Sequence, residues 1–161
     1  MNKVIEVDFL PRQTDVAFSW LSSIGNSTQR RILIVDNDKN TTHLVKILLE
    51  KTGRYVVLEE NDSTRTHQRA RNFRPDLIFL DVDMPGRDAS EIAAQVRTDP
   101  ELQYTPIIFL TALGMQDEAK TGFRIEKHPF LAKPIDIQEL INAIEAHVPA
   151  RFQDRGYDKR A

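Results

Sequence analysis

Short apolar runs, each bounded by polar or turn residues, most restrict the folds that this chain can adopt. They are residues 32–35, 77–80, 107–110 and, shorter, 130–132, and a fifth run at 55–58 is rich in β-branched residues. None of them alternates apolar with polar residues, which is typical of strands buried on both faces of a parallel sheet. The sequence therefore predicts five strands in a sheet that is covered on both sides.

The segments between these runs carry apolar residues at helical spacing. The three clearest stripes are Leu44 with Ile47 and Leu48, Ile92 with Ala93 and Val96, and Leu140 with Ile141, Ile144 and Val148. Gly53 stands where a helix C-cap would be, and Pro75 and Pro106 precede the third and fourth strands. A helix over 63–73 has a weak stripe and several arginines, which favours a solvated basic face over a docking patch. Strands that alternate with helices predict an α/β domain with right-handed crossovers.

The chain has 161 residues, enough for one domain and short extensions. We expect a domain at 30–148, an N-terminal extension at 1–29, and a C-terminal tail at 149–161 that is too short for a DNA-reading module. Apolar residues in the extension would share one face of a short amphipathic helix: Val16, Ala17, Trp20, Leu21 and Ile24. Such a helix is marginal alone, so it packs on its own domain, packs on a partner, or stays frayed; the first is favoured.

Composition excludes several functional classes. The apolar runs are far shorter than the roughly 20 residues of a membrane span, and Asp8, Pro11 and Arg12 interrupt any secretory signal. The absence of cysteine excludes disulfides and thiolate metal sites, and it fits a cytoplasmic location. The four histidines lack metal-ligand spacing. A net charge of −2 gives no reason to expect a nucleic acid partner.

Polar residues follow the carboxyl ends of four of the predicted strands. They are Asp36, Asn37 and Asp38 after the first, Asp81 and Asp83 after the third, Thr111 after the fourth, and Lys133 after the fifth. Ligands of open parallel sheets bind beyond these strand ends. Taken alone, an Asp at a strand end is most often a helix cap or a loop residue, a Thr is commonly a local backbone partner, and a Lys is a surface charge. Together they predict a site with carboxylates, a hydroxyl and an ammonium at one edge of the sheet.

Four segments resemble signature segments of response-regulator receiver domains, of the chemotaxis-regulator-like kind. They are Ile32-Leu-Ile-Val-Asp-Asn-Asp, Leu80-Asp-Val-Asp-Met-Pro-Gly, Phe109-Leu-Thr-Ala and Phe130-Leu-Ala-Lys-Pro. The resemblance covers about residues 31–148. It implies a flavodoxin-like, doubly wound sheet of five parallel strands in the order 2-1-3-4-5, with helices on both faces. It also implies a single-domain response regulator of two-component or phosphorelay signalling.

The resemblance implies a role for each site residue. Asp81 would accept a phosphoryl group from a histidine kinase or a histidine phosphotransfer protein. Mg²⁺ would be held by Asp36, by the side chain of Asp81 and by the backbone carbonyl of Asp83. Thr111 and Lys133 would contact phosphoryl oxygens, and Phe130 would turn inward when Thr111 moves. The Lys133–Pro134 peptide bond would be cis.

The output of such a chain would be a surface that depends on phosphorylation. That surface would bind a downstream protein or a second copy of the chain, and no membrane or nucleic acid. The chain would catalyse only its own phosphorylation and dephosphorylation, so it would not be an enzyme in the usual sense.

Two alternatives stay open: one rests on a departure from the family pattern and the other on a separate motif. The family usually has two adjacent acids after the first strand, and here the second is Asn37. Its amide oxygen can coordinate Mg²⁺ but adds no charge, while Asp83 brings a carboxylate to the border of the pocket. A pseudo-receiver that docks without phosphorylation is therefore one alternative. A phosphatase of the haloacid dehalogenase type is the other, because Asp81-Val-Asp83 resembles its acid pair. In that family, however, the acid pair is the first of the site motifs along the chain, whereas here the acidic cluster at Asp36 precedes it.

Overall fold

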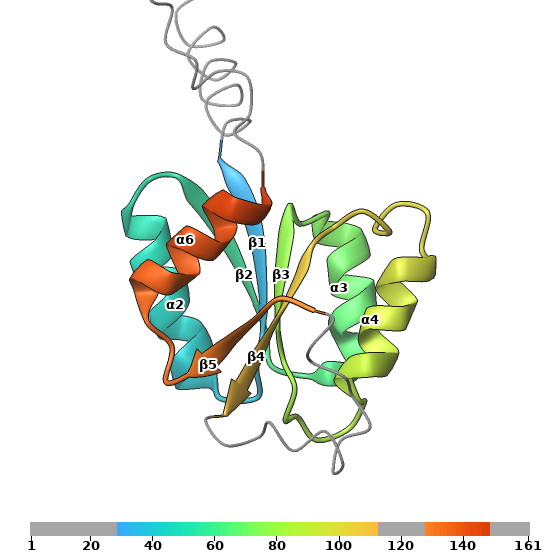
Figure 1. Ribbon diagram of the computed structural model, residues 1–161. Helices are drawn as coiled ribbons and strands as arrows, with labels where there is room; N and C mark the ends of the chain where they lie inside the picture. The colour runs from blue at the N-terminus through green and yellow to red at the C-terminus, as the bar shows by residue number, and fades with distance from the viewer. Residues whose placement is uncertain (1–28, 113–127, 149–161) are drawn as a thin grey trace, which may run out of the picture.

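The computed structural model describes residues 29–112 and 128–148 (Figure 1). In chain order the elements are β1 (Arg30–Val35), α2 (Lys39–Lys51), β2 (Tyr55–Glu60), the 3-10 helix η1 (Ser63–Arg65), α3 (Thr66–Phe73), β3 (Leu77–Asp81), α4 (Ala89–Thr98), β4 (Ile107–Ala112), β5 (Phe130–Lys133) and α6 (Ile137–His147). The predicted tail and all but the last residue of the predicted extension lie outside the described residues.

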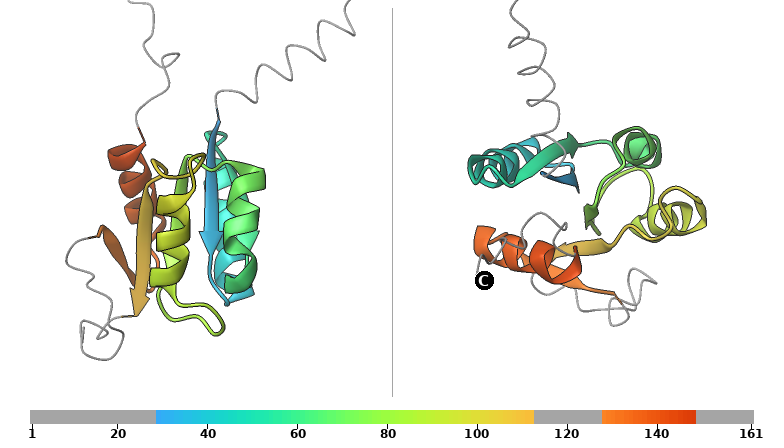
Figure 2. Two further views of the ribbon diagram at one scale, coloured as in Figure 1. Left: turned by 90° about the vertical axis from the view of Figure 1, so that its right-hand side faces the viewer. Right: turned by 90° about the horizontal axis from the view of Figure 1, so that it is seen from above.

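The strands form one parallel sheet in the order β2-β1-β3-β4-β5, which confirms the predicted fold class. Helices α2 and α6 cover one face of the sheet, and α3 and α4 cover the other (Figures 1 and 2). Since all five strands run the same way, their carboxyl ends meet at one edge. The residues at or just after the carboxyl ends of β1, β3 and β5 are therefore brought together.

Two apolar cores explain why the strands do not alternate in sequence. Ile32 and Ile34 of β1 pack under α2 and α6, while Leu33 and Val35 pack under α3 and α4. All four side chains are fully buried. A strand with helices on both sides must be apolar at every position, which is what the uninterrupted runs predicted.

Helix α2 presents a different face to the sheet from the one its stripe suggested. The stripe residues Leu44, Ile47 and Leu48 are 57%, 49% and 36% exposed. The residues buried against the sheet are instead Val45 and Leu49, together with Thr42. Both sets have helical spacing, because apolar residues crowd this part of the chain, and periodicity alone does not choose between them.

Polar contacts fix the rotation of α2. Asn61 donates a hydrogen bond from Nδ2 to Oγ1 of Thr42 at 3.0 Å, and Lys46 donates from Nζ to the Val57 carbonyl at 2.6 Å. Each bond joins the helix to the strand β2 or to the turn after it. These contacts hold the Thr42 side of α2 toward the sheet, so the stripe faces outward.

In α4 and α6 the most deeply buried residues are those of the predicted apolar stripes. Ile92, Val96, Leu140 and Ile144 are at most 1% exposed, as their stripes predicted. The expected helix at 63–73 divides into η1 and α3. Its basic face is solvated, as expected, since the side chains of Arg69, Arg71 and Arg74 are 38%, 53% and 72% exposed. They also pair with acids: Arg69 with Glu60 at 3.1 Å, Arg71 with Asp99 at 3.3 Å and Arg74 with Glu101 at 3.5 Å.

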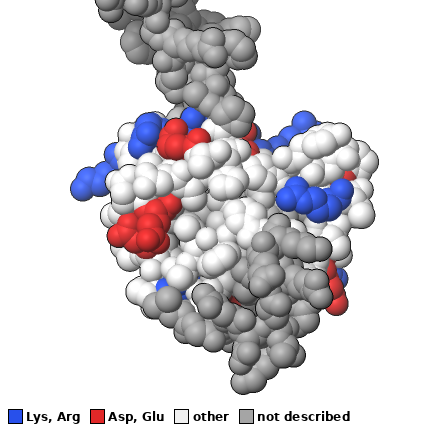
Figure 3. All heavy atoms as spheres, viewed as in Figure 1, with Lys and Arg blue, Asp and Glu red and all other residues white. Residues whose placement is uncertain are grey.

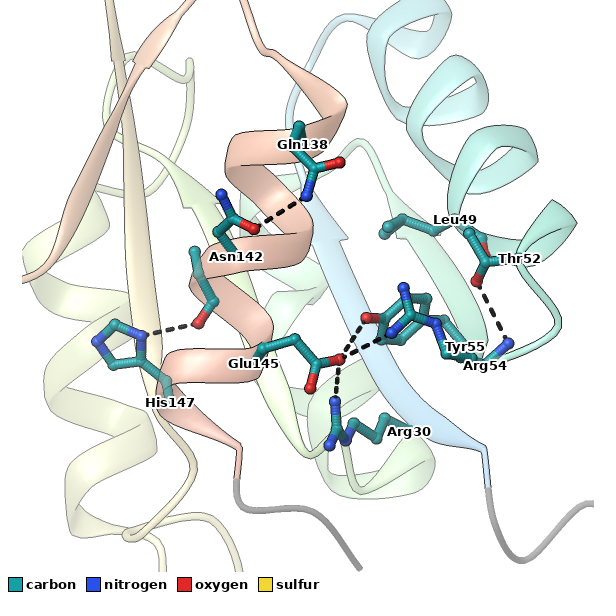
Figure 4. Close-up of polar contacts among 10 residues, drawn as sticks. Arg30, Leu49, Thr52, Arg54, Tyr55, Gln138, Asn142, Glu145 and His147 are labelled. Atoms are coloured by element: carbon teal, nitrogen blue, oxygen red, sulfur yellow. Dashed lines mark hydrogen bonds and ion pairs between the residues drawn. The ribbon is translucent and has the colours of Figure 1, made fainter. Parts of the chain in front are cut away.

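At the amino edge of the sheet, Glu145 joins α6 to the first two strands (Figure 4). Its Oε1 accepts hydrogen bonds from Tyr55 OH at 2.8 Å and from Arg30 Nη1 at 2.5 Å. This cluster anchors the C-terminal half of α6 at the edge opposite the strand ends described below.

In the described part of the chain no helix has the length and apolar character needed to cross a membrane.

Candidate functional site

Asp36, the first residue after β1, is fully buried and held by its backbone and its side chain. Its amide donates to the Glu60 carbonyl at 3.1 Å, and its carbonyl accepts from Asn61 Nδ2 at 2.7 Å. Its Oδ1 accepts from the Asp38 amide at 2.9 Å. The turn after β1 therefore fixes this carboxylate and leaves Oδ2 directed at the strand ends.

Asp81 and Lys133 complete a charged cluster with Asp36. Asp81 ends β3 and is 3% exposed, and its Oδ1 accepts from the Asp83 amide at 3.2 Å. Lys133 ends β5, and its Nζ lies 3.1 Å from Asp81 Oδ2 and 2.5 Å from Asp36 Oδ2. The bond between Lys133 and Pro134 is cis, as expected. Three strands thus bring two carboxylates and one ammonium together.

Burial and charge repulsion set the protonation of this cluster. Burial, followed by the charge of Asp36, raises the pKa of Asp81 to about 6, although the Asp83 amide and Lys133 act in the opposite direction. Burial alone would lower the pKa of Lys133, but hydrogen bonding to Asp36 and the charge of Asp81 outweigh it and raise that pKa. The ammonium therefore stays charged at neutral pH and balances only one of the two carboxylates.

Thr111 and Phe130 lie on the neighbouring strands. Thr111 is 7% exposed and follows Leu110, which is the register partner of Asp81. Within the described residues its hydroxyl makes no hydrogen bond to the charged cluster. Phe130 begins β5 and is 46% exposed, so its ring points outward here. It pairs in register with Phe109, two residues before Thr111, so both side chains belong to the same side of the sheet.

The remaining predicted residues border the cluster. Asn37 and Asp83 are both exposed. Asp38 is the N-cap of α2 and accepts from the Asn40 amide at 3.0 Å and from Thr41 Oγ1 at 2.6 Å, which agrees with its expected place at the start of the first helix. In residues 29–112 and 128–148, no three side chains of His, Cys, Asp or Glu are grouped so that they could hold a metal.

The cluster nevertheless has the charge and donor atoms that suit a hard cation. Asp36 Oδ2 is buried, and the Lys133 ammonium lies against it at 2.5 Å. Mg²⁺ in proteins commonly takes only one or two carboxylates and completes its shell with water and phosphate oxygens. Asp36 and Asp81, with the Asn37 amide and the Asp83 backbone carbonyl nearby in sequence, fit that requirement.

A residue that sequence reasoning missed holds the loop after Asp81. Ser63 donates from Oγ to the Pro85 carbonyl at 2.8 Å and accepts from the Arg87 amide at 2.7 Å. Between these two residues Gly86 has a φ of +97°, and a Cβ there would lie 2.7 Å from Ser63 Oγ. Gly86 was visible within a motif, but nothing in the sequence singled out Ser63, because it becomes a neighbour of the loop only in the folded sheet.

Comparisons with known proteins point to one family. A family model described as the response regulator receiver domain matches residues 32–145. The chain is 34% identical over 116 residues to the DNA-binding dual master transcriptional regulator RpaA of Synechocystis, and the match covers 72% of this chain and 48% of RpaA. It is 31% identical to protein PilH of Pseudomonas aeruginosa over 72% of this chain and 95% of PilH. The match thus spans about half of RpaA and nearly all of PilH.

A solved structure shares the fold. The receiver domain of sensor histidine kinase PA1611 from P. aeruginosa, with a magnesium ion coordinated in its active site cleft, matches with a TM-score of 0.65. The sequences are 24% identical, and the match covers 74% of this chain and 98% of that one.

Proposed function

This chain belongs to the response-regulator receiver family, and on that premise we propose that it is a phosphorylation switch whose acceptor is Asp81. The observation that carries the proposal is the buried Asp81 carboxylate at the carboxyl edge of the sheet, with Lys133 Nζ 3.1 Å from Oδ2. A carboxylate is a weak nucleophile, so placement and charge neutralisation must supply the catalysis. The ammonium beside Asp81 is one such neutralising group.

In the proposed reaction, an oxygen of Asp81 attacks the phosphorus of a phosphohistidine on a histidine kinase or a phosphotransfer protein. The O–P bond forms as the P–N bond breaks, and the imidazole nitrogen keeps the electron pair and takes up a proton. Water later hydrolyses the aspartyl phosphate and returns the Asp81 carboxylate and inorganic phosphate. The chain would therefore modify its own side chain, with the phosphohistidine protein as the phosphoryl donor.

Lys133 and Thr111 would receive the phosphoryl group. The ammonium of Lys133 already lies between two carboxylates and would pair with a phosphoryl oxygen once that group arrives. The Thr111 hydroxyl, which makes no hydrogen bond to the cluster within the described residues, would donate to another oxygen. Phe130 would then move inward from its exposed position and pass the signal to the surface near β5.

Mg²⁺ is the cofactor we propose for this site. Asp36 and Asp81 would hold it with the Asp83 backbone carbonyl and the Asn37 amide, and the PA1611 receiver structure has a magnesium ion in its cleft. When bound, the ion would neutralise the negative charge that gathers around the phosphoryl group. Asn37 contributes no charge, so we expect weaker binding than at a site with a carboxylate in that position.

Incubation with acetyl phosphate and Mg²⁺, followed by intact mass measurement, tests the proposal. We expect wild type to gain one phosphoryl group, Asp81→Asn to gain none, and Asp83→Asn, which keeps its backbone carbonyl, to remain competent. Phosphorylated Asp81→Asn would place the acceptor elsewhere. A wild-type chain that binds Mg²⁺ but gains no phosphoryl group would favour the alternative based on Asn37, a pseudo-receiver that docks without phosphorylation.

A further inference from the structure

An apolar groove lies beside the charged cluster, between α2 and the segment after β5. Leu44 and Leu48 of α2 line it on one side, and Pro134, Ile135 and Ile137 line it on the other, around a cavity of about 240 Å³. We call this surface the α2 groove. Of the five large hydrophobic side chains exposed in the described residues, three belong to α2: Leu44, Ile47 and Leu48.

The character of the α2 groove calls for an apolar occupant. Among the described residues, Lys133 is the one charged residue that lines it, and the Nζ of this lysine is engaged by Asp36 and Asp81. Figure 3 shows an acidic patch on the left of this face and a basic patch on the right, with largely uncharged atoms between them. Contiguous exposed apolar surface on a protein usually marks a contact with another segment or another molecule.

The start of the described chain lies close to this groove. Gln29 donates from Nε2 to the Gly53 carbonyl at 2.9 Å, just beyond the C-terminal end of α2. Leu48 and Leu44 are five and nine residues before Gly53, which places them about 8 and 14 Å back along the helix axis. The extended chain from Ile24 to Gln29 can span about 16 Å. Residues before Ile24 can therefore reach the whole groove.

The sequence just before Gln29 has a complementary apolar face. Val16, Ala17, Trp20, Leu21 and Ile24 recur at helical spacing, and a helix of that length needs a surface to be stable in water. We propose that residues 16–24 of the same chain pack their apolar face, Trp20 included, into the α2 groove. This docking goes beyond the proposed phosphorylation and does not depend on it.

Trp20 is the single tryptophan of the chain, so its fluorescence reports directly on the docking. In the full chain we expect emission at shorter wavelength than that of free tryptophan and acrylamide quenching that is several-fold weaker. Leu44→Glu and Leu48→Glu should shift the emission to longer wavelength and bring quenching to the level of free tryptophan. Both sites are exposed, so circular dichroism should remain that of a folded protein. Tyr104→Glu, at a side chain that is 88% exposed, is the matched control and should change neither signal.

Three results would overturn the proposal. The first is a wild-type Trp20 that acrylamide quenches as readily as free tryptophan. The second is a protected Trp20 that Leu44→Glu and Leu48→Glu leave unchanged, because the segment would then pack elsewhere. The third is protection that appears only as the protein concentration rises, because a second copy of the chain would then fill the groove.

Discussion

At the scale of single residues, burial and the charge of Asp36 destabilise the ionised form of Asp81. Its pKa of about 6 lies above its ordinary 3.8. Between these values the folded chain binds more protons than the unfolded chain, so stability falls as the pH rises through this range, by roughly 3 kcal/mol in all. Without Mg²⁺, Asp81→Asn should therefore raise the free energy of unfolding at about pH 7.5 by roughly 1–3 kcal/mol.

Urea unfolding of both proteins over a range of pH, in the presence of a chelator, checks this. The gap between them should close as the pH falls from about 6 to about 4, because the folded wild type then protonates Asp81. Asp83→Asn, at an exposed carboxylate, serves as the control and should track wild type. A gap that keeps its size at every pH would mean that the charge of Asp81 is not its source.

Asn37 and Asp83 determine how much negative charge surrounds the proposed Mg²⁺ site. Asn37→Asp adds a carboxylate beside the buried Asp36 and should tighten Mg²⁺ binding by roughly 3- to 30-fold, because attraction between charges this close is worth about 1 kcal/mol or more. Asp83→Ala should loosen binding by a smaller factor. Titration of Mg²⁺ by calorimetry measures both, with Glu101→Gln, an exposed acid in the segment before β4, as a control. Two unchanged affinities would remove these residues from the site.

The site residues that could be predicted from the sequence are those at the end of an apolar run, where a strand was expected to end. Asp36, Asp81 and Lys133 each follow or end an apolar run, and the structure brings all three together. Asn61 and Ser63 follow β2, and their partners lie on other segments: the Asp36 carbonyl, Thr42 and the loop around Gly86. Such contacts depend on β2 lying next to β1, and neither composition nor periodicity sets that order.

At the scale of elements, the loop between β3 and α4 tolerates a side chain at its glycine less well than the turn after α2 does. Gly53 and Gly86 both have positive φ, but a Cβ at Gly53 would meet nothing within 4 Å, whereas one at Gly86 would meet Ser63 Oγ at 2.7 Å. Gly53→Ala should cost about 1–2 kcal/mol of stability for its backbone conformation. Gly86→Ala should cost that and roughly 1–3 kcal/mol more for the clash. Thermal or urea unfolding compares the two.

A double-mutant cycle separates the clash from the backbone strain. Ser63→Ala removes the oxygen that the new Cβ would meet, at the expense of two hydrogen bonds to the loop. The cost of Ser63→Ala with Gly86→Ala should therefore be less than the sum of the single costs by roughly 1 kcal/mol or more. Additive costs would show that the loop moves away from Ser63 without loss.

Helix α2 shows which part of an element its sequence can specify. The N-cap Asp38 and the positive-φ Gly53 mark its two ends, and both are readable from the chain. The face that it buries was not readable, because Leu44, Ile47 and Leu48 are as apolar as Val45 and Leu49. Hydrogen bonds from Asn61 and Lys46 to distant partners decide the rotation. An exposed apolar stripe is the result, and the α2 groove follows from it.

At the scale of the whole molecule, the order of strands and helices was predictable because burial on both faces leaves a strong pattern. Uninterrupted apolar strands required a covered parallel sheet, and such a sheet gathers its strand ends at one edge. The strand order 2-1-3-4-5 came from the resemblance to the family, and the structure confirms it. The same order makes β4 and β5 neighbours, so a change at Thr111 can be passed to Phe130.

The last prediction concerns that connection. Thr111 and Phe130 belong to one side of the β4–β5 pair, two residues apart in register, and Phe130 is 46% exposed. If a phosphoryl group draws Thr111 toward Asp81, Phe130 can occupy the space that it leaves, and its exposure should fall. We expect a Phe130→Trp reporter in a Trp20→Phe background to shift its emission to shorter wavelength when beryllofluoride and Mg²⁺ are added.

Thr111→Ala in the same background is the control. This variant lacks the hydroxyl that would draw residue 111 toward Asp81, so the emission shift should be lost while beryllofluoride still binds. A partner that prefers the switched state must in turn stabilise it, because a ligand shifts an equilibrium only through its different affinities for the two states. Self-association of the wild-type chain, measured by sedimentation with and without beryllofluoride, tests a second copy as that partner. An unshifted emission from the Phe130→Trp reporter, in a protein that has bound beryllofluoride, would show that β5 does not carry the output.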